Sequence, residues 1–249
     1  MFDVSTEYLA TVVLTFFVAG VVKGVTGMGL PTVAMAVLGA LISPLAAASL
    51  LILPSFVTNV WQMLDGPGLR PLLRRLWPML LPAAAVTVPA SAWIARGSAE
   101  IATGALGATL VVYAAYTLLV RAIRTPAALE RWLSPVIGGA TGAVAGGTGV
   151  VVVPALPYLQ SLGFGRDELV QALGLSFTVS TVALAAGLTA HGAYDPGDVA
   201  LSGLAILPAL AGMRAGQAIR GRISPRAFRL GFLLCLLLLG GEMALRPLL

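Results

Sequence analysis

Apolar residues occur in ten blocks that are separated by short connections rich in charge, glycine or proline. The blocks cover residues 8–26, 30–42, 44–64, 76–95, 101–120, 133–148, 150–163, 168–190, 199–219 and 225–246. Most of them run for roughly 15–22 residues, the length of a helix that crosses a hydrocarbon core of about 30 Å. The pattern therefore predicts an all-α integral membrane protein.

Two of the blocks, residues 30–42 and 150–163, are too short to cross a bilayer, because a helix of ~13 residues reaches only about 20 Å. Each follows a glycine cluster, and each is expected to fold back against the preceding helix. The result would be a re-entrant hairpin with its glycine tip at mid-membrane depth. Non-helical backbone is tolerated at that depth only where it is buried in protein or lines a cavity. Full crossings are the alternative.

The first hairpin sequence recurs in the second half of the chain. GVVKGVTGMGLP, which starts at Gly20, is matched by GAVAGGTGVVVVP, which starts at Gly142. Each half contains one hairpin and three further crossings, and an odd number of crossings inserts the second half upside down. We expect a first inverted-topology repeat at 1–120, a cytoplasmic connecting loop at 121–132 and a second inverted repeat at 133–249.

Composition and charge place the chain in a membrane. The sequence is 58% hydrophobic and 10% charged, and its mean hydropathy is +0.96. The net charge of +5 comes from arginines in short connections, so it does not indicate a nucleic-acid partner. Most of these arginines fall on one side of the predicted threading, which marks that side as cytoplasmic. We expect a multi-pass protein of the plasma (inner) membrane with both termini outside, and a homo-oligomer is compatible with the sequence.

The two glycine clusters are the first candidate binding elements. A helix that is broken inside a membrane exposes backbone N–H groups and a positive dipole end, which together suit an oxyanion. The threonines beside the glycines add hydroxyl donors. Glycines spaced by four also let helices pack closely, and we expect that role for Gly138 and Gly142. The candidate residues are Gly24, Thr26, Gly27 and Gly29 in the first cluster, and Gly146, Gly147, Thr148 and Gly149 in the second.

Lys23 is the only lysine of the chain and lies inside the first apolar block, just before the glycine tip. Ionisable residues inside a membrane are costly and tend to be functional, so its ammonium group is a candidate partner for an anionic substrate. The alternatives are snorkelling to an interface or pairing with a helix carbonyl. Asn59, Ser176 and Ser180 are further candidate substrate contacts, although hydroxyls in apolar helices often bond to their own backbone.

The sequence offers no enzyme machinery. It contains no HExxH, Walker or GxSxG motif, and no cluster of His, Asp, Glu or Cys lies inside an apolar block. His191 is the only histidine and Cys235 the only cysteine, so neither a metal site nor a disulfide is expected. We therefore predict no cofactor and no catalytic role.

The duplicated Gly-Thr-Gly…Pro segments, the LGFGRDELVQAL turn and the Gly-Arg-Ile-Ser-Pro-Arg turn resemble the TauE/SafE sulfite-exporter family of anion permeases. The resemblance covers nearly the whole chain, and the second glycine copy is the closer match. It implies a secondary transporter, expected to be an exporter, of a small sulfur-containing anion such as sulfite or an organosulfonate. The anion would bind at mid-membrane between the two glycine breaks. The alternatives are a permease for thiosulfate uptake or for a carboxylate, and a membrane scaffold subunit without a pathway.

Overall fold

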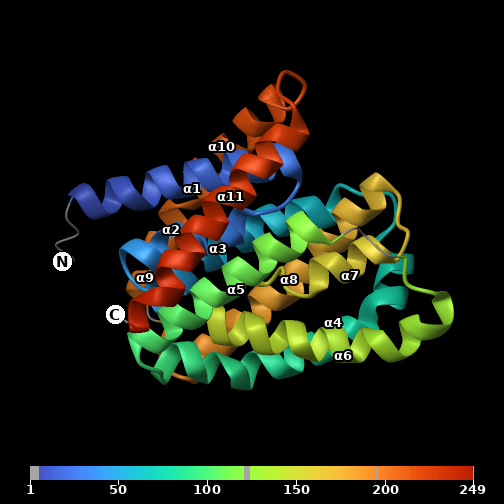
Figure 1. The fold of residues 1–249 in the computed structure, drawn as a ribbon, viewed down its shortest axis with the longest axis horizontal. Helices are drawn as coiled ribbons and strands as arrows, with labels where there is room; N and C mark the ends of the chain where they lie inside the picture. The colour runs from blue at the N-terminus through green and yellow to red at the C-terminus, as the bar shows by residue number, and fades with distance from the viewer. Residues whose placement is uncertain (1–5, 121–123, 195, 249) are drawn as a thin grey trace.

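The computed structural model describes residues 6–120, 124–194 and 196–248, and within these ranges the chain is helical with no β-strand. Figure 1 shows the helices in their order along the chain. Their bounds are α1 (Thr6–Thr26), α2 (Leu30–Leu41), α3 (Pro44–Leu64), α4 (Leu69–Arg96), α5 (Ala99–Leu119), α6 (Ala127–Thr148), α7 (Ala155–Ser161), α8 (Arg166–Ala190), α9 (Pro196–Leu204), α10 (Ile206–Ile219) and α11 (Pro225–Leu245), followed by the 3₁₀ turn η1 (Arg246–Leu248).

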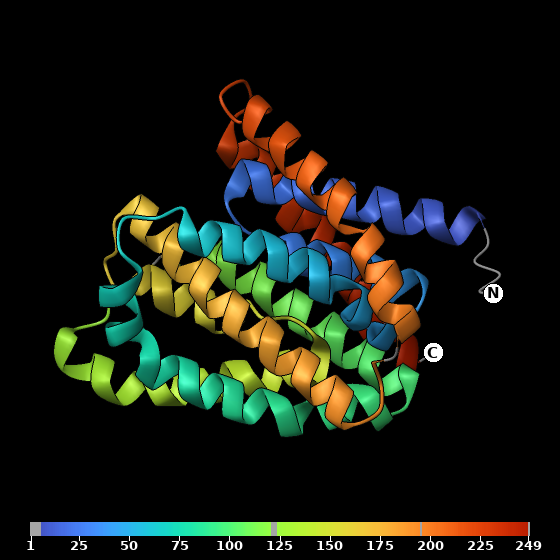
Figure 2. The ribbon, with the colours of Figure 1, turned by 180° about the vertical axis from the view of Figure 1, so that it is seen from behind.

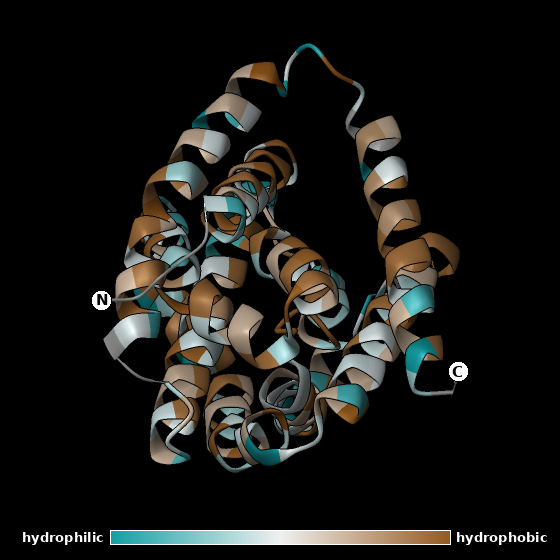
Figure 3. Ribbon diagram, turned by 90° about the vertical axis from the view of Figure 1, so that its left-hand side faces the viewer, coloured by the Kyte–Doolittle hydropathy of each residue, from teal (hydrophilic) through white to brown (hydrophobic). Residues whose placement is uncertain are grey.

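In the described part of the chain, seven helical segments are long and apolar enough to cross a membrane. They are α1, α3, α4, α5, α8, the α9–α10 pair and α11, whereas α2 is too short. Figure 3 shows hydrophobic colour along most helices, with the strongest hydrophilic colour at several turns and helix ends. The predicted all-α membrane protein is therefore confirmed, and α1 itself has the length of a full crossing.

Serine caps define where three of these helices begin. The hydroxyl oxygens of Ser43, Ser98 and Ser224 each accept a hydrogen bond from the backbone N–H three residues later, at the starts of α3, α5 and α11. A side-chain acceptor at this position satisfies one of the N–H groups that a helix leaves unpaired. Short polar turns thus separate the apolar blocks at the places where the sequence changes composition.

Some helix bounds differ from the apolar blocks. α4 begins at Leu69, seven residues before its block, because arginine is a good helix former and extends the helix past the membrane-spanning part. α6 begins at Ala127, inside the stretch expected to be the connecting loop, of which residues 121–123 lie outside the described residues. The block at 199–219 is divided at Ala205, because Pro208 has no N–H to donate to the carbonyl four residues earlier.

The first helix of each predicted half packs against a helix of the other half. α1 packs along α10, and α6 packs along α4, so the two pairs form opposite edges of the molecule (Figures 1 and 2). At both crossings a Cβ on the glycines would meet backbone atoms of the partner helix, which confirms the predicted packing role of Gly138 and Gly142. The other glycines in these contacts are Gly20, Gly24, Gly146, Gly212 and Gly216.

Two further pairs, α3–α8 and α5–α11, are in extensive contact, and α3 and α8 are the most buried of the membrane-length helices. In the predicted repeats these would be corresponding helices, and α1 and α6 would be exchanged reciprocally. Two repeats related by a two-fold axis would pack in this way. The start of α1 and the end of α11 also lie at the same end of the bundle (Figure 1). The inverted symmetry and the repeat boundaries stay predictions that this packing favours.

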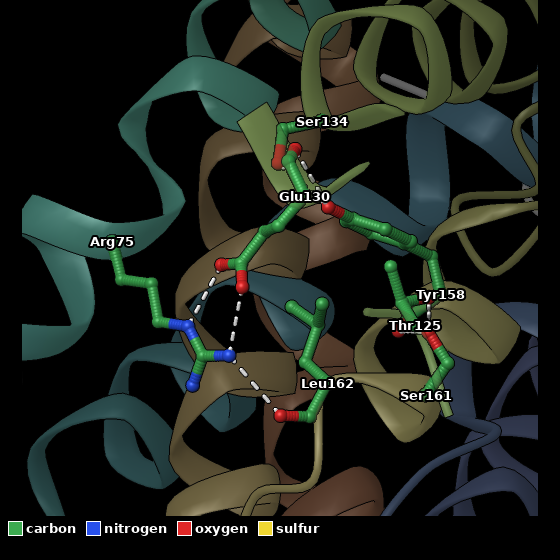
Figure 4. A network of polar contacts seen from close by, with 7 residues as sticks. All are labelled: Arg75, Thr125, Glu130, Ser134, Tyr158, Ser161 and Leu162. Carbon is green, nitrogen blue, oxygen red and sulfur yellow. Dashed lines mark hydrogen bonds and ion pairs between the residues drawn. The ribbon is translucent and has the colours of Figure 1, made fainter. Parts of the chain in front are cut away.

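A polar network fastens the second hairpin to its neighbours (Figure 4). The guanidinium of Arg75 on α4 donates to both carboxylate oxygens of Glu130 on α6, at 2.7 and 2.9 Å, and to the carbonyl of Leu162 at 3.1 Å. The hydroxyls of Ser134 and Tyr158 lie 2.7 Å apart and tie α6 to α7. These bonds hold the short helix α7 against α6, and the residue after α7 against α4, at the end of the molecule that carries most arginines.

Candidate functional site

The first glycine cluster ends α1. Gly27 and Gly29 have φ angles of +81° and +101°, a region that glycine enters without steric penalty. The hydroxyl of Thr26 donates to the carbonyl of Val22 at 2.8 Å and accepts from the N–H of Met28 at 3.2 Å. The chain therefore leaves the helix at Gly27, turns, and begins α2 at Leu30, as the predicted break requires.

The second cluster ends α6 with the same local pattern. Gly149 has a φ of +72°, and the hydroxyl of Thr148 donates to the carbonyl of Val144 at 2.7 Å and accepts from the N–H of Val150 at 3.3 Å. The two threonines thus close their own helix ends. Because both hydroxyl protons are used by the backbone, the observed role of Thr26 and Thr148 is to terminate helices.

Lys23 is buried, with 4% of its surface exposed. Its Nζ donates to the side-chain oxygen of Asn59 and, at 3.2 Å, to the hydroxyl of Thr58, both on α3. Neither partner is charged, and no carboxylate pairs with Lys23 within the described ranges. Lys23 therefore neither snorkels to water nor bonds to a helix carbonyl of the described residues, and a protonated Nζ has no counter-ion among them.

The polar contacts of Lys23 continue across α3 to α8. The amide of Asn59 donates to the hydroxyl of Ser55 at 3.0 Å, and that hydroxyl lies 3.3 Å from the hydroxyl of Thr181. All these side chains are buried. Buried polar groups are strongly favoured to have hydrogen-bond partners, so this chain of contacts holds α1, α3 and α8 in a fixed relation.

A cavity of about 370 Å³ opens beside Lys23, between α1, α3, α8 and α10. The amide of Gln62 donates to the carbonyls of Gly27 and Val170, at 2.8 and 3.0 Å, and so fixes the glycine tip against this cavity. We call the space the Lys23 cavity. Its lining residues are Lys23, Gly24, Gly27, Thr58, Trp61, Gln62, Asp65, Arg166, Asp167, Val170, Met213, Gln217 and Arg220.

The structure brings together only part of the predicted site. Lys23, Gly24 and Gly27 line the Lys23 cavity, and Asn59 reaches it through Lys23. The second glycine cluster lies elsewhere: a Cβ on Gly146 would meet α4, and one on Gly149 would meet Met35 of α2. The buried hydroxyls of Ser176 and Ser180, on α8, have no hydrogen-bond partner among the described residues.

The first break contacts its neighbours close to their ends. Its contacts are Gln62, about half a turn before α3 ends, and Val170, about one turn after α8 begins. The tip thus lies near the helix ends on the arginine-rich side of the molecule. The cavity described here lies at the first break, and binding at mid-membrane between the two breaks stays a prediction.

Several lining residues were not selected from the sequence. Ser55, Thr58, Asn59 and Gln62 follow the spacing i, i+3, i+4, i+7, so they form one polar face on an otherwise apolar helix. That pattern is a usable signal for Thr58 and Gln62. The arginines of the cavity gave no such signal, because loop arginines are also explained by membrane orientation.

The fold and the cavity beside the buried Lys23 define a class: a multi-pass membrane protein with a polar site in its helix bundle. Within the described residues, no group of three or more His, Cys, Asp or Glu side chains is placed to hold a metal ion. The family model of the sulfite exporter TauE/SafE matches residues 12–243, nearly the whole chain. The chain therefore belongs to the TauE/SafE family and is a membrane transport protein. No curated protein and no solved structure matches it.

Proposed function

We propose that this protein is a secondary transporter that exports a small sulfur-containing anion, such as sulfite or an organosulfonate, and that the anion binds in the Lys23 cavity. The observation that carries the proposal is the only lysine of the chain, buried beside a glycine break with two neutral partners. The family match supports the substrate class. Permeation of thiosulfate or of a carboxylate remains the alternative.

The uncompensated charge of Lys23 favours anion binding. A buried ion is costly unless an opposite charge or a complete set of hydrogen bonds compensates it. Asp65 and Asp167, the two carboxylates that line the cavity, are both exposed, and neither bonds to Lys23. An anion that enters the cavity supplies the missing charge at little reorganisation, since the ammonium is already held in place by Thr58 and Asn59. A scaffold subunit would gain nothing from this arrangement.

Export follows from the membrane potential. With the inside negative, moving one negative charge outward gains about 2.3 kcal/mol per 100 mV, a bias of nearly fiftyfold. The carboxylate relay that proton coupling often uses is not evident, because Glu100 and Glu242 are exposed at helix ends. An uncoupled carrier would therefore run outward whenever the anion accumulates inside.

This direction assumes that the arginine-rich end faces the cytoplasm of an inner membrane and that both termini lie outside. The assumption is testable with single cysteines at Ser98 and Arg124 on a Cys235→Ala background. An impermeant thiol reagent added to intact cells should label position 98 and leave position 124 unmodified. Equal labelling of both positions would overturn the proposed orientation.

The transport proposal is tested with purified protein in proteoliposomes. Flux of radiolabelled sulfite is measured under an imposed potassium-diffusion potential, in competition with thiosulfate, taurine, sulfoacetate and acetate. Lys23→Met should weaken sulfite affinity about ten- to a hundredfold, because a hydrogen bond to a charged group contributes roughly 1.5–3 kcal/mol. Arg214→Met is the matched control, since it removes an exposed cation of α10.

Three results would each contradict a part of the proposal. Sulfite affinity unchanged in folded Lys23→Met protein would remove Lys23 from the binding site. Acetate transported in preference to every sulfur anion would replace the substrate class by carboxylates. A proton or sodium gradient that drives accumulation while the potential has no effect would overturn passive export.

A further inference from the structure

A second cavity lies on the other side of the first glycine break. It has a volume of about 220 Å³ and is reached from the ends of six helices. We call it the arginine pocket, after the three arginines in its wall. Its polar lining residues are Thr26, Thr117, Gln160, Arg166, Arg220 and Arg229.

The three arginines converge on the pocket from different helices. Arg166 is the first residue of α8, Arg220 directly follows α10, and Arg229 lies in the second turn of α11. None of them pairs with a carboxylate in the part of the chain that the structure describes, and no described Asp or Glu lines the pocket. The pocket therefore concentrates positive charge, whereas the Lys23 cavity also contains two carboxylates.

Neutral donors complete this set. Thr117, on α5, and Gln160, on α7, line the pocket, and neither side chain has a hydrogen-bond partner among the described residues. A guanidinium presents several N–H groups in a plane, which matches the oxygens of phosphate, sulfate-like and carboxylate groups. Three guanidinium groups with hydroxyl and amide donors nearby form a recognition set for a compact group with several oxygens.

We propose that the arginine pocket is a second oxyanion site, which collects the anion at the arginine-rich end before it enters the Lys23 cavity. This inference rests on the proposed function and adds a site to it. Arg166 and Arg220 line both cavities, so an anion would have these two cationic neighbours in either one.

The pocket also has an approach on its other side. Thr117, Gln160 and Arg229 line a further cavity of about 540 Å³, between α5, α7 and α11. The arginine pocket thus shares lining residues with this cavity on one side and with the Lys23 cavity on the other. An oxyanion at this end of the molecule comes either from solution or from the phosphate of an anionic lipid, and the chemistry of the pocket is the same for both.

The test is equilibrium binding of radiolabelled sulfite to the purified full-length protein in nanodiscs of phosphatidylcholine. We expect two sites in the wild type and one in Lys23→Met. Arg229→Gln should weaken the second site tenfold or more and leave the Lys23-dependent site intact, because Arg229 lines only the arginine pocket and the approach cavity. Arg214→Gln, at an exposed position of α10, is the matched control.

Arg229→Lys separates loss of charge from loss of fold. It should keep the second site within a few-fold of the wild type, and thermal unfolding should show that all variants are folded. Binding by Arg229→Gln that equals the wild type, in both the native and the Lys23→Met background, would overturn the arginine pocket and leave the proposed function standing. Loss of only the Lys23-independent site in Arg229→Gln would support the arginine pocket as a second oxyanion site.

A lipid arm distinguishes the two sources of the oxyanion. The same titrations are repeated in nanodiscs that contain phosphatidylglycerol. If sulfite binds at the Arg229-dependent site in nanodiscs without phosphatidylglycerol, the result supports collection of a free anion. A pocket that takes phosphatidylglycerol but no sulfite would overturn its role in transport and make it a lipid-phosphate site.

Discussion

Asn59→Asp should weaken anion binding in the Lys23 cavity while it leaves the stability of the fold nearly unchanged. Asn59 is the only asparagine of the chain, and its side-chain oxygen accepts from the ammonium of Lys23. The substitution keeps the shape of the side chain and replaces a neutral acceptor by a carboxylate. It thereby gives Lys23 an internal counter-ion at the place where the substrate charge would otherwise act.

The size of the effect follows from the contact distance. Two unit charges about 4 Å apart interact by about 4 kcal/mol at an effective dielectric constant of about 20. A carboxylate in contact with Lys23 cancels most of this attraction for an incoming anion. Since ~1.4 kcal/mol is a factor of ten in affinity, sulfite binding should weaken at least about a hundredfold. Stability should change little, within about 2 kcal/mol, because a buried ion pair roughly balances its own desolvation.

The assay is sulfite binding and thermal unfolding of the same nanodisc preparation. Gln217→Glu is the matched control: it adds the same charge to the cavity wall, but at an exposed position where water screens it. Its affinity should fall only a few-fold. Sulfite affinity that is unchanged in folded Asn59→Asp protein would refute the reasoning, because it would show that the anion does not use the charge of Lys23.

The remaining predictions concern the helix contacts. Gly216→Ala places a methyl group against the backbone of α1 and should destabilise the protein by about 1–3 kcal/mol in thermal unfolding, whereas Gly221→Ala, in open space, should have no such effect. If Gly221→Ala were less stable to thermal unfolding than Gly216→Ala, the result would contradict the close packing of α10 on α1. A double-mutant cycle of Arg75→Ala and Glu130→Ala should give a coupling of roughly 1 kcal/mol, since the pair is bidentate but partly exposed. Additive effects would show that the pair does not hold α4 to α6.

The sequence predicted much of the fold, because the length of an apolar block is enough to identify a membrane helix. The glycine breaks were also predictable, since α1 ends at Thr26 and α6 at Thr148, directly before glycines with positive φ. The bounds that differed depend on local chemistry. Arginines prolong α4 beyond the apolar block, and Pro208 removes the N–H that would otherwise continue α9 into α10.

The site was predictable only in part. Lys23 and Asn59 were selected because they are polar residues inside apolar blocks, and they are in direct contact. The assumption that both glycine breaks face one site had no support in local sequence. Whether two breaks meet depends on how the helices of one half pack against those of the other. The exchange of α1 and α6 leaves the breaks against different helices, and no pattern within either segment encodes that pairing.

The exchange of first helices has a consequence for how the protein is made. α1 is synthesised early, but its partner α10 begins only at Ile206, and synthesis at about 5–20 residues per second delays that partner by on the order of ten seconds or more. During this interval the glycine face of α1 has only lipid or an insertion factor to cover it. The first half lacks α10, the partner of α1, and the second half lacks α4, the partner of α6. Neither half is therefore expected to fold completely on its own. The last stretch of translation, not the insertion of the first hairpin, therefore completes the fold.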